Sequence, residues 1–180
     1  MKNMKNNLTC EGYGRSLKDM EDAEDRGINE KISIYIQDTL HKKKILKLKD
    51  CKLWLRTLHA LVKTNPDTSS SSITIRIVGE KESESLNYNY RNQKKPTNIL
   101  SFVLSENPLI GDIILCHPVI KNEAKNQNKK IRSHYAHLLI HGYLHLLGYS
   151  HDKKLDAEIM EKKEIQVLKR CGFQNPYINS

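Results

Sequence analysis

Alternation of hydrophobic and polar residues marks four short segments of the chain as β-strands. The segment 32–36 places isoleucine at every second position, and the segment 73–78 repeats that period of two. The segments 99–104 and 111–116 are apolar runs of similar length on either side of the turn sequence SENP. Each of the four is bounded by polar or turn-forming residues, which favours strands over helix interiors.

Five other segments carry the longer spacing of apolar residues that is typical of helices. They are 49–62, 80–90, a segment that opens at Pro118, 131–147 and 155–170. The segment 131–147 is apolar on most of its sides, which predicts a helix that is buried all round. Strands and helices intermix along the chain, so we predict an α+β fold: a single small mixed sheet packed by about five helices, with the candidate metal-binding histidines on the buried central helix.

The first thirty residues differ from the rest of the chain. They are polar, acidic in their second half, and have no sustained hydrophobic period. We predict that 1–30 is a disordered N-terminal extension and that 31–180 forms one domain.

The chain is basic, with a formal net charge of +9. The first thirty residues contain more acidic than basic side chains, so the excess of positive charge lies in the predicted domain. A cationic domain favours a polyanionic partner, and nucleic acid is the first candidate. Charge alone leaves open a lysine-rich protein without such a partner.

The cysteines and the apolar segments bear on the compartment. The four cysteines lie far apart and form no C-x-x-C pair, which argues against a disulfide framework or a thiolate zinc site. No apolar run approaches the length of a membrane-spanning helix, and the N-terminus lacks the apolar core of a signal peptide. We therefore expect a cytoplasmic protein without membrane contact.

The stretch HGYLHLLGYSHD has the spacing of a metal site. On a helix, His141 and His145 lie one turn apart on the same face, so both imidazoles can reach one ion at about 2.0–2.1 Å. Gly148 can turn the chain at low cost, which brings His151 to the same ion. A pair of histidines alone is a weak signal, but the glycine and third histidine match the ligand spacing of zinc hydrolases. We predict one Zn²⁺ per chain, with one coordination position open for water or substrate.

The residue after the first histidine is Gly142, where metalloproteases of this spacing have a glutamate that activates the zinc-bound water. Without that carboxylate, peptide hydrolysis by this route is disfavoured. Cleavage of a phosphodiester instead requires positive charge placed near the phosphate, which a cationic domain can supply. His137 lies one turn before His141, and we interpret it as a core residue or as a hydrogen-bond partner of a ligand imidazole. His134 lies near His137 in the sequence, and three further histidines have no partner spacing and are interpreted as structural or solvated: His41, His59 and His117.

Four segments, in order along the chain, resemble the YbeY family of bacterial endoribonucleases. The segment HGYLHLLGYSH resembles the family's motif H-G-x-L-H-L-x-G-Y-D-H. The other three segments are LNYNYRNQKKPTNILSF, GDIILCHPVIKNEA and GFQNPY. These segments lie between residues 86 and 177, and the resemblance as a whole spans roughly 32–177, which is nearly the whole predicted domain.

The resemblance implies a zinc-dependent endoribonuclease that acts on single-stranded RNA, in maturation of the small-subunit rRNA 3′ end and in ribosome quality control. The implied partners are rRNA, the small ribosomal subunit with its proteins, and a ribosome-assembly GTPase, with no role for DNA. The family's metal ligands match His141, His145 and His151, and its functional arginine matches Arg91. We predict Arg91 and His141 as catalytic residues, since an arginine stays charged and can bind phosphate through two parallel hydrogen bonds.

Two details of the resemblance leave alternatives open. Lys94 and Lys95 follow Arg91 and are candidates for RNA binding, although a solvated loop is an equal alternative. The family has aspartate before the third histidine, where this chain has Ser150, with Asp152 after it. Either residue could therefore orient a histidine or a water beside the metal.

Metal-assisted RNA cleavage is our leading hypothesis. The sequence does not identify the general base, nor whether water or the RNA's own 2′-hydroxyl attacks. A second hypothesis, from a different functional class, is a ribosome-assembly factor whose metal is mainly structural. A third hypothesis is a metal-dependent hydrolase that cleaves another kind of bond.

Overall fold

The computed structural model describes residues 32–40, 45–62 and 71–178. The predicted extension 1–30, His41 and Cys10 lie outside the described residues. In chain order the elements are β1 (Ile32–Asp38), α1 (Leu48–Leu61), β2 (Ser71–Val78), α2 (Glu80–Arg91), β3 (Ile99–Glu106), β4 (Leu109–Cys116), α3 (His117–Asn126), α4 (Ile131–Leu146) and α5 (Lys154–Arg170). The α+β class and every strand and helix predicted from the hydrophobic pattern are confirmed. The hairpin is tighter than predicted, because β3 continues to Glu106 and β4 already begins at Leu109.

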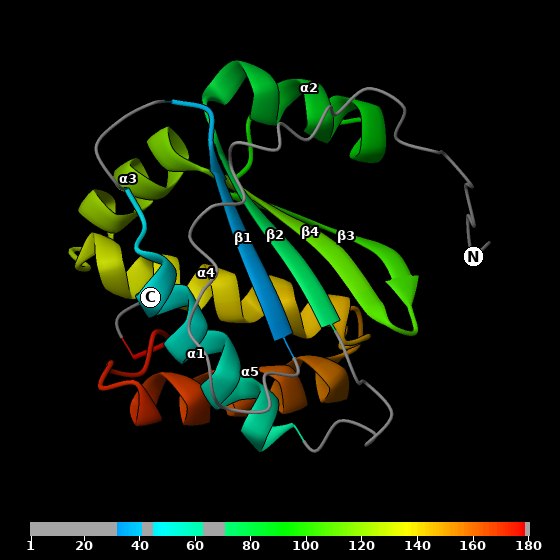
Figure 1. Cartoon of the computed structure of the whole chain (residues 1–180). Coiled ribbons are helices and arrows are strands. Elements are labelled where there is room, and N and C mark those ends of the chain that lie inside the picture. The colour runs from blue at the N-terminus through cyan, green and yellow to red at the C-terminus, as the bar shows by residue number, and fades with distance from the viewer. Residues whose placement is uncertain (1–31, 41–44, 63–70, 179–180) are drawn as a thin grey trace.

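The four strands form one mixed sheet in the order β1-β2-β4-β3. Strand β2 pairs in parallel with both β1 and β4, whereas β3 pairs antiparallel with β4. Helix α1 provides the crossover between the first parallel pair, and α2 begins the longer connection between the second. The loop that follows α2 leads directly into β3. Because β3 is an edge strand, this loop lies at the edge of the sheet (Figure 1).

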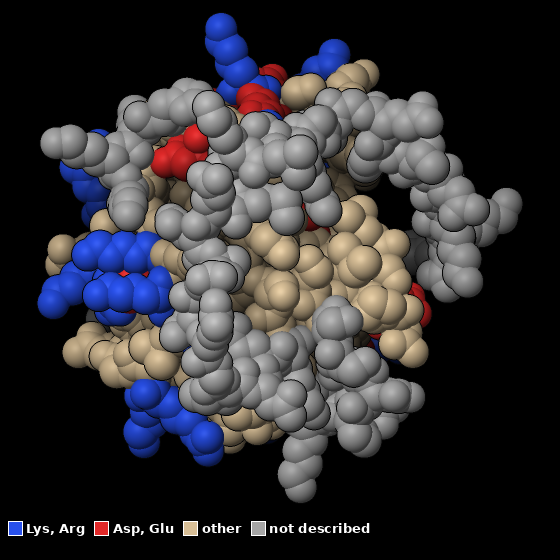
Figure 2. Space-filling view, in the orientation of Figure 1, with Lys and Arg blue, Asp and Glu red and all other residues tan. Residues whose placement is uncertain are grey.

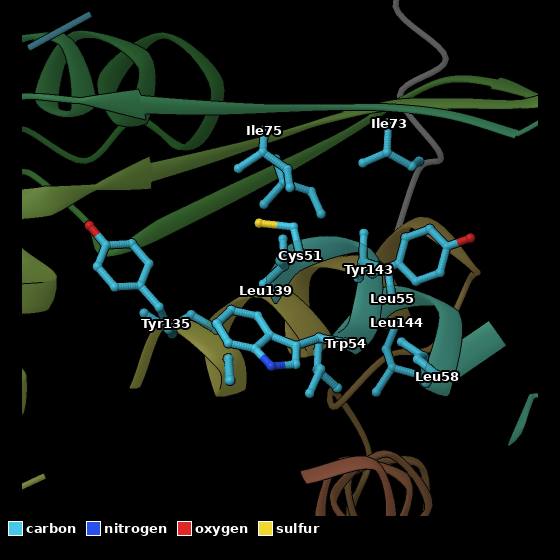
Figure 3. Close-up of a cluster of buried hydrophobic side chains, with 14 of the residues drawn as sticks. Cys51, Trp54, Leu55, Leu58, Ile73, Ile75, Tyr135, Leu139, Tyr143 and Leu144 are labelled. Carbon is cyan, nitrogen blue, oxygen red and sulfur yellow. The ribbon is translucent and has the colours of Figure 1, made fainter. Parts of the chain in front are cut away.

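Helix α4 is the centre of the fold. It contacts β3 and β4 on one side and α1, α3 and α5 on its others, which explains why its sequence is apolar all round (Figure 1). Trp54 and Leu55 of α1 meet Leu139 and Tyr143 of α4 in the interior, and Ile75 of β2 closes the cluster from the sheet (Figure 3). All five side chains are fully buried. Burial of each such side chain contributes about 1.5–3 kcal/mol, so α4 is held by packing that does not depend on its histidines.

A smaller apolar cluster lies under α2. Leu100 of β3 and Ile114 of β4 pack there with Val78, and Leu86 of α2 covers them. This contact fixes α2, and therefore the basic loop after it, against the sheet. None of the helices within the described ranges combines the length and the apolar character that crossing a lipid bilayer requires.

At Gly142, α4 packs closely against the sheet. A β-carbon at this position would lie 2.6 Å from Cδ1 of Ile99, 2.9 Å from Oγ of Ser101 and 3.2 Å from Cγ2 of Ile113. Position 142 thus faces strands β3 and β4. A glutamate there would enter the packed layer between helix and sheet, so the glycine is a packing requirement of this fold.

We expect Gly142→Glu to destabilise the chain strongly, because it forces a long charged side chain into a space too small for a methyl group. Gly142→Ala is expected to cost about 1 kcal/mol, since the steric penalty exceeds the gain in helix propensity. Thermal unfolding followed by circular dichroism measures both. Ile131→Glu, at an exposed position in the first turn of α4, serves as the control and should unfold like the native chain. Native stability of Gly142→Glu would contradict the packing argument.

Candidate metal centre

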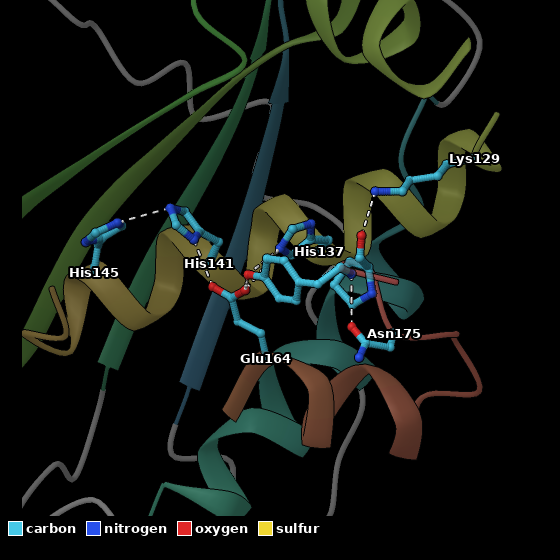
Figure 4. A network of polar contacts seen from close by, with 8 residues as sticks. Lys129, His137, His141, His145, Glu164 and Asn175 are labelled. Carbon is cyan, nitrogen blue, oxygen red and sulfur yellow. Dashed lines mark hydrogen bonds and ion pairs between the residues drawn. The ribbon is translucent and has the colours of Figure 1, made fainter. Parts of the chain in front are cut away.

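Helix α4 aligns three histidines along one side. His137, His141 and His145 follow one another at intervals of four residues, and each is half-buried. The ring centroids of His141 and His145 lie 4.6 Å apart, and those of His137 and His141 lie 6.3 Å apart. The helix therefore presents a row of imidazoles, of which the last two are close neighbours (Figure 4).

The turn after α4 returns the chain toward this row. Gly148 has a φ of +85°, in the left-handed region that glycine adopts at low cost. Its N–H donates to the carbonyl of His145 at 3.0 Å, and the N–H of Tyr149 donates to the carbonyl of Leu144 at 3.0 Å. These bonds close the end of the helix in the manner expected for a glycine after the last turn. The reversed chain then carries His151 to within 4.9 Å of His145, measured between ring centroids.

The three histidines of the motif converge on one point. Each of His141, His145 and His151 offers a ring nitrogen, and these nitrogens lie within 4.8 Å of one another. His141 donates its Nδ1–H to Oε1 of Glu164 at 2.8 Å, and His145 donates its Nδ1–H to the carbonyl of Tyr149 at 3.0 Å. Both Nε2 atoms then carry lone pairs, and they face each other at 3.1 Å. Two such lone pairs repel unless a cation lies beside them, so the donor set fits a bound metal ion.

The environment of His145 keeps this imidazole neutral. Burial lowers the pKa of His145 below its ordinary value, and the neighbouring His141 and His151 lower it further. A neutral imidazole is the form that binds a metal. His151 is exposed, so the centre lies at the surface end of the row and is open on that side.

Glu164 of α5 binds two histidines of the row, and it was not predicted from the sequence. Its side chain is fully buried and accepts three hydrogen bonds: from Nδ1 of His141 at 2.8 Å, from Nε2 of His137 at 3.0 Å, and from the hydroxyl of Tyr177 (Figure 4). Burial alone would raise the pKa of Glu164, but the hydrogen bonds from the two histidines and Tyr177 outweigh it and lower the pKa to about 2. Glu164 is therefore a carboxylate that fixes the ring orientation of His141.

The sequence did contain a signal for Glu164. This carboxylate lies on the same face of α5 as Met160, Val167 and Leu168, all of which are buried. A glutamate within an apolar helical stripe is rarely buried without a partner. His137 bonds the same residue, so the Glu164 carboxylate is shared between His137 and His141.

Ser150 makes a local hydrogen bond that bears on the departure from the family motif. Its Oγ accepts the backbone N–H of Asp152 at 3.0 Å. An aspartate at position 150 would accept the same N–H, since Asp and Ser both form such turns. The serine therefore retains the turn that leads through His151. Asp152 itself is exposed.

Arg91 is the last residue of α2 and is exposed. Its positive charge is one of the factors that lower the pKa of His145, so the guanidinium lies within electrostatic range of the histidine cluster. Lys94 and Lys95 are exposed too, and the ammonium of Lys94 lies 5.3 Å from the centre of the Tyr88 ring. The basic residues named from the sequence thus project from one short segment.

The loop between α2 and β3 is held in place by buried polar side chains of α2. Asn87 donates from Nδ2 to the carbonyl of Lys95 at 2.8 Å. Ser83 donates from Oγ to the carbonyl of Thr97 at 2.8 Å and accepts the N–H of the same residue at 3.0 Å. These bonds fix the loop backbone, so the basic side chains extend from an anchored support.

The remaining described histidines have structural partners. His134 bonds Glu123 of α3 at 2.8 Å, and His117 shares a hydrogen bond of 2.8 Å with the hydroxyl of Tyr135. His59 lies on α1, away from the motif in the sequence. A structural interpretation therefore fits His134 and His117.

A pocket of about 340 Å³ opens beside the histidine cluster, between the start of β3, α4 and the first half of α5. His141 and His151 form part of its wall, so the pocket and the candidate metal position are contiguous.

The face shown in Figure 2 carries basic side chains mainly at its periphery.

Comparison with known proteins gives consistent results. The model of the family described as "Endoribonuclease YbeY" matches residues 35–172. A protein of that name from Coxiella burnetii (strain RSA 493 / Nine Mile phase I) is 40% identical over 153 residues, which covers 81% of this chain and 98% of that protein. Another from Alteromonas mediterranea is 48% identical over 114 residues, covering 61% of this chain and 72% of that protein. The solution structure of TM1509 from Thermotoga maritima matches with a TM-score of 0.52 and 25% identity, over 78% of this chain and 91% of that one.

Proposed function

The chain belongs to the YbeY family of endoribonucleases, and we propose that it is itself a zinc-dependent endoribonuclease that cuts single-stranded RNA. Its place would be late maturation of the small-subunit rRNA 3′ end and ribosome quality control. The partners would be rRNA, the small ribosomal subunit and a ribosome-assembly GTPase. The observation that carries the proposal is the pair of facing Nε2 atoms of His141 and His145, 3.1 Å apart, with His151 beside them.

Three imidazoles at these distances favour zinc among the common metals. A bound zinc would supply Lewis acidity toward an oxygen of the scissile phosphate. His141, His145 and His151 would hold it, and Glu164 would keep the Nδ1–H of His141 occupied so that Nε2 remains the ligand atom.

Arg91 would bind the phosphate and stabilise the negative charge that develops on it during cleavage. The proximity of its charge to the histidine cluster supports this role, because Arg91 is one of the groups that lower the pKa of His145. Lys94 and Lys95, on the anchored loop, would add attraction for the neighbouring phosphates.

A mainly structural metal is the alternative, and the openness of the centre disfavours it. Structural zinc sites are closed by four protein ligands. Among the described residues, the group that could hold an ion consists of three histidines, of which His151 is exposed. The adjoining pocket leaves room for a substrate beside the ligands.

Arg91→Gln is expected to lower kcat/KM for a single-stranded RNA by about 10²-fold, a magnitude observed when one preorganised charge-stabilising group is removed. Zinc content and thermal stability should stay native, because Arg91 is exposed. The control is Arg170→Gln, which removes the same charge at the far end of α5, about 24 Å along the helix from its first turn. Equal activity of the two variants would show that Arg91 acts only through net charge.

A further inference from the structure

The pocket beside the histidine cluster has two kinds of surface. Ile99, Leu138, Ala157 and Met160 contribute apolar atoms from β3, α4 and α5. Polar side chains from the same elements and from the C-terminal segment complete the lining. A volume of about 340 Å³ is near the lower end of the usual range of ligand pockets, which is roughly 300–1,000 Å³. The pocket thus suits one small group that has both apolar and polar surface.

We infer that this pocket receives one unstacked nucleobase of the RNA, from a nucleotide next to the phosphate that is cut. The inference rests on the proposed function, and it adds a recognition site that neither the metal ligands nor Arg91 supplies. Because His141 and His151 are shared between the pocket wall and the candidate metal centre, a base in the pocket is adjacent to a phosphate at the metal.

The negative charge of the pocket lining favours binding of a base and disfavours binding of a phosphate. Glu161 and Glu164 both line it, and none of the described lining residues is lysine or arginine. A phosphate would meet two carboxylates there, so the anionic backbone stays at the side of the metal and Arg91. The group that enters the pocket is therefore not an anion, and a neutral base meets this condition whereas a phosphate does not.

The polar edges of the pocket favour bases that donate hydrogen bonds. Asn98 uses its Nδ2 to donate to both carboxylate oxygens of Glu123, at 3.1 and 3.2 Å, which leaves its Oδ1 as an acceptor. Glu161 is exposed at the pocket and accepts through its carboxylate. The exocyclic amino group of adenine, cytosine or guanine supplies two N–H donors, whereas uracil offers only its N3–H, so the first three bases fit these edges better.

The same site gives a physical reason for acting on single strands. A base within a duplex is stacked and paired, and extracting it costs a few kcal/mol. A base in a single strand can be splayed out and bound between side chains at much lower cost. The pocket thereby couples recognition of an unpaired base to placement of the adjoining phosphate.

The test begins with the zinc-loaded native chain and a short single-stranded RNA whose cut site has first been mapped. One nucleotide at a time is made abasic on both sides of that cut, and kcat/KM is measured for each strand. We expect a loss of about tenfold at one adjacent position, in line with the energies measured for single bases on protein surfaces. Replacing that nucleotide in turn by A, C, G and U should show U disfavoured by about fivefold.

A variant that fills the pocket should remove this selectivity. Ala157→Leu projects a branched side chain from the half-buried α5 position into the pocket, and we expect the abasic loss and the discrimination against U to disappear. Zinc content should remain native, because position 157 is not a ligand. Gln166→Leu, an uncharged exchange at an exposed position of α5 outside the pocket, should retain the native selectivity.

The outcomes separate the two proposals. A native chain that cleaves RNA with no dependence on either adjacent base overturns the pocket and leaves the proposed function standing. A zinc-loaded native chain that cleaves no single-stranded RNA overturns the proposed function, and the pocket inference falls with it. If Ala157→Leu loses zinc or fails to fold, the abasic and base series on the native chain decide the question alone.

Discussion

Glu164→Ala is expected to weaken zinc binding by about 10- to 100-fold, the usual effect of removing a group that orients a metal-binding histidine. It leaves three donors without their acceptor: Nδ1 of His141, Nε2 of His137 and the hydroxyl of Tyr177. Removal of one partner from such a buried network also costs about 3 kcal/mol of unfolding free energy. The imidazole of His141 would then be free to rotate or change tautomer, and its Nε2 would no longer be held toward the ion.

Glu164→Gln separates orientation from charge. The amide keeps the shape of the carboxylate and one acceptor oxygen, but its NH₂ group faces a donor. We therefore expect zinc affinity between those of the native chain and Glu164→Ala. Competition with a chromogenic chelator measures the affinity, and thermal unfolding monitors the fold. Glu158→Gln, at an exposed position of the same helix, is the matched control. Native zinc affinity in Glu164→Ala would mean that the buried carboxylate does not position the ligand, and native affinity in Glu164→Gln alone would mean that its charge is not needed.

The helices and strands could be predicted from the sequence because each buries one face, and burial imposes a period on the chain. Alternation along 32–36 and 73–78 and the all-round apolar character of 131–147 correspond to β1, β2 and α4. The order β1-β2-β4-β3 could not be predicted in the same way. Strand order depends on how α1 and α2 pack over the sheet, and no local pattern records that packing.

In the candidate site, too, the locally determined residues could be predicted, and the residue brought in by a long-range contact could not. His141, His145 and His151 could be predicted to converge because helix geometry and one glycine turn determine their spacing locally. Glu164 reaches His141 only because α5 packs on α4, across 23 positions of sequence. A contact between two helices that lie far apart in the sequence cannot be predicted from the spacing of residues along the chain.

Gly142 shows how a motif comparison can mislead. Against the protease motif it is a missing glutamate, which directs attention to the chemistry of the centre. In the structure the position faces Ile99 and Ser101 of β3, where any side chain would collide. The conclusion that the protease base is absent holds. The physical reason, however, lies in the packing of α4 on the sheet.

Removal of the metal is expected to abolish RNA cleavage and to leave the chain folded. Small zinc domains unfold without their ion because they lack a sufficient core. Here α4 is anchored by fully buried side chains such as Leu139 and Tyr143, which do not contact the ion. His145→Ala should behave like the metal-free native chain: folded by circular dichroism, without zinc by elemental analysis, and inactive. Lys153→Ala, an exposed exchange two positions after His151, should retain both zinc and activity.

Reconstitution of the metal-free native chain with measured amounts of zinc shows whether RNA cleavage depends on the bound metal. Cleavage of a single-stranded RNA is followed at each step while circular dichroism confirms that the fold is unchanged. The account predicts that the rate rises in proportion to bound zinc and reaches its plateau at one ion per chain, whereas His145→Ala stays inactive throughout. Cleavage at the native rate by folded, metal-free chain would contradict it.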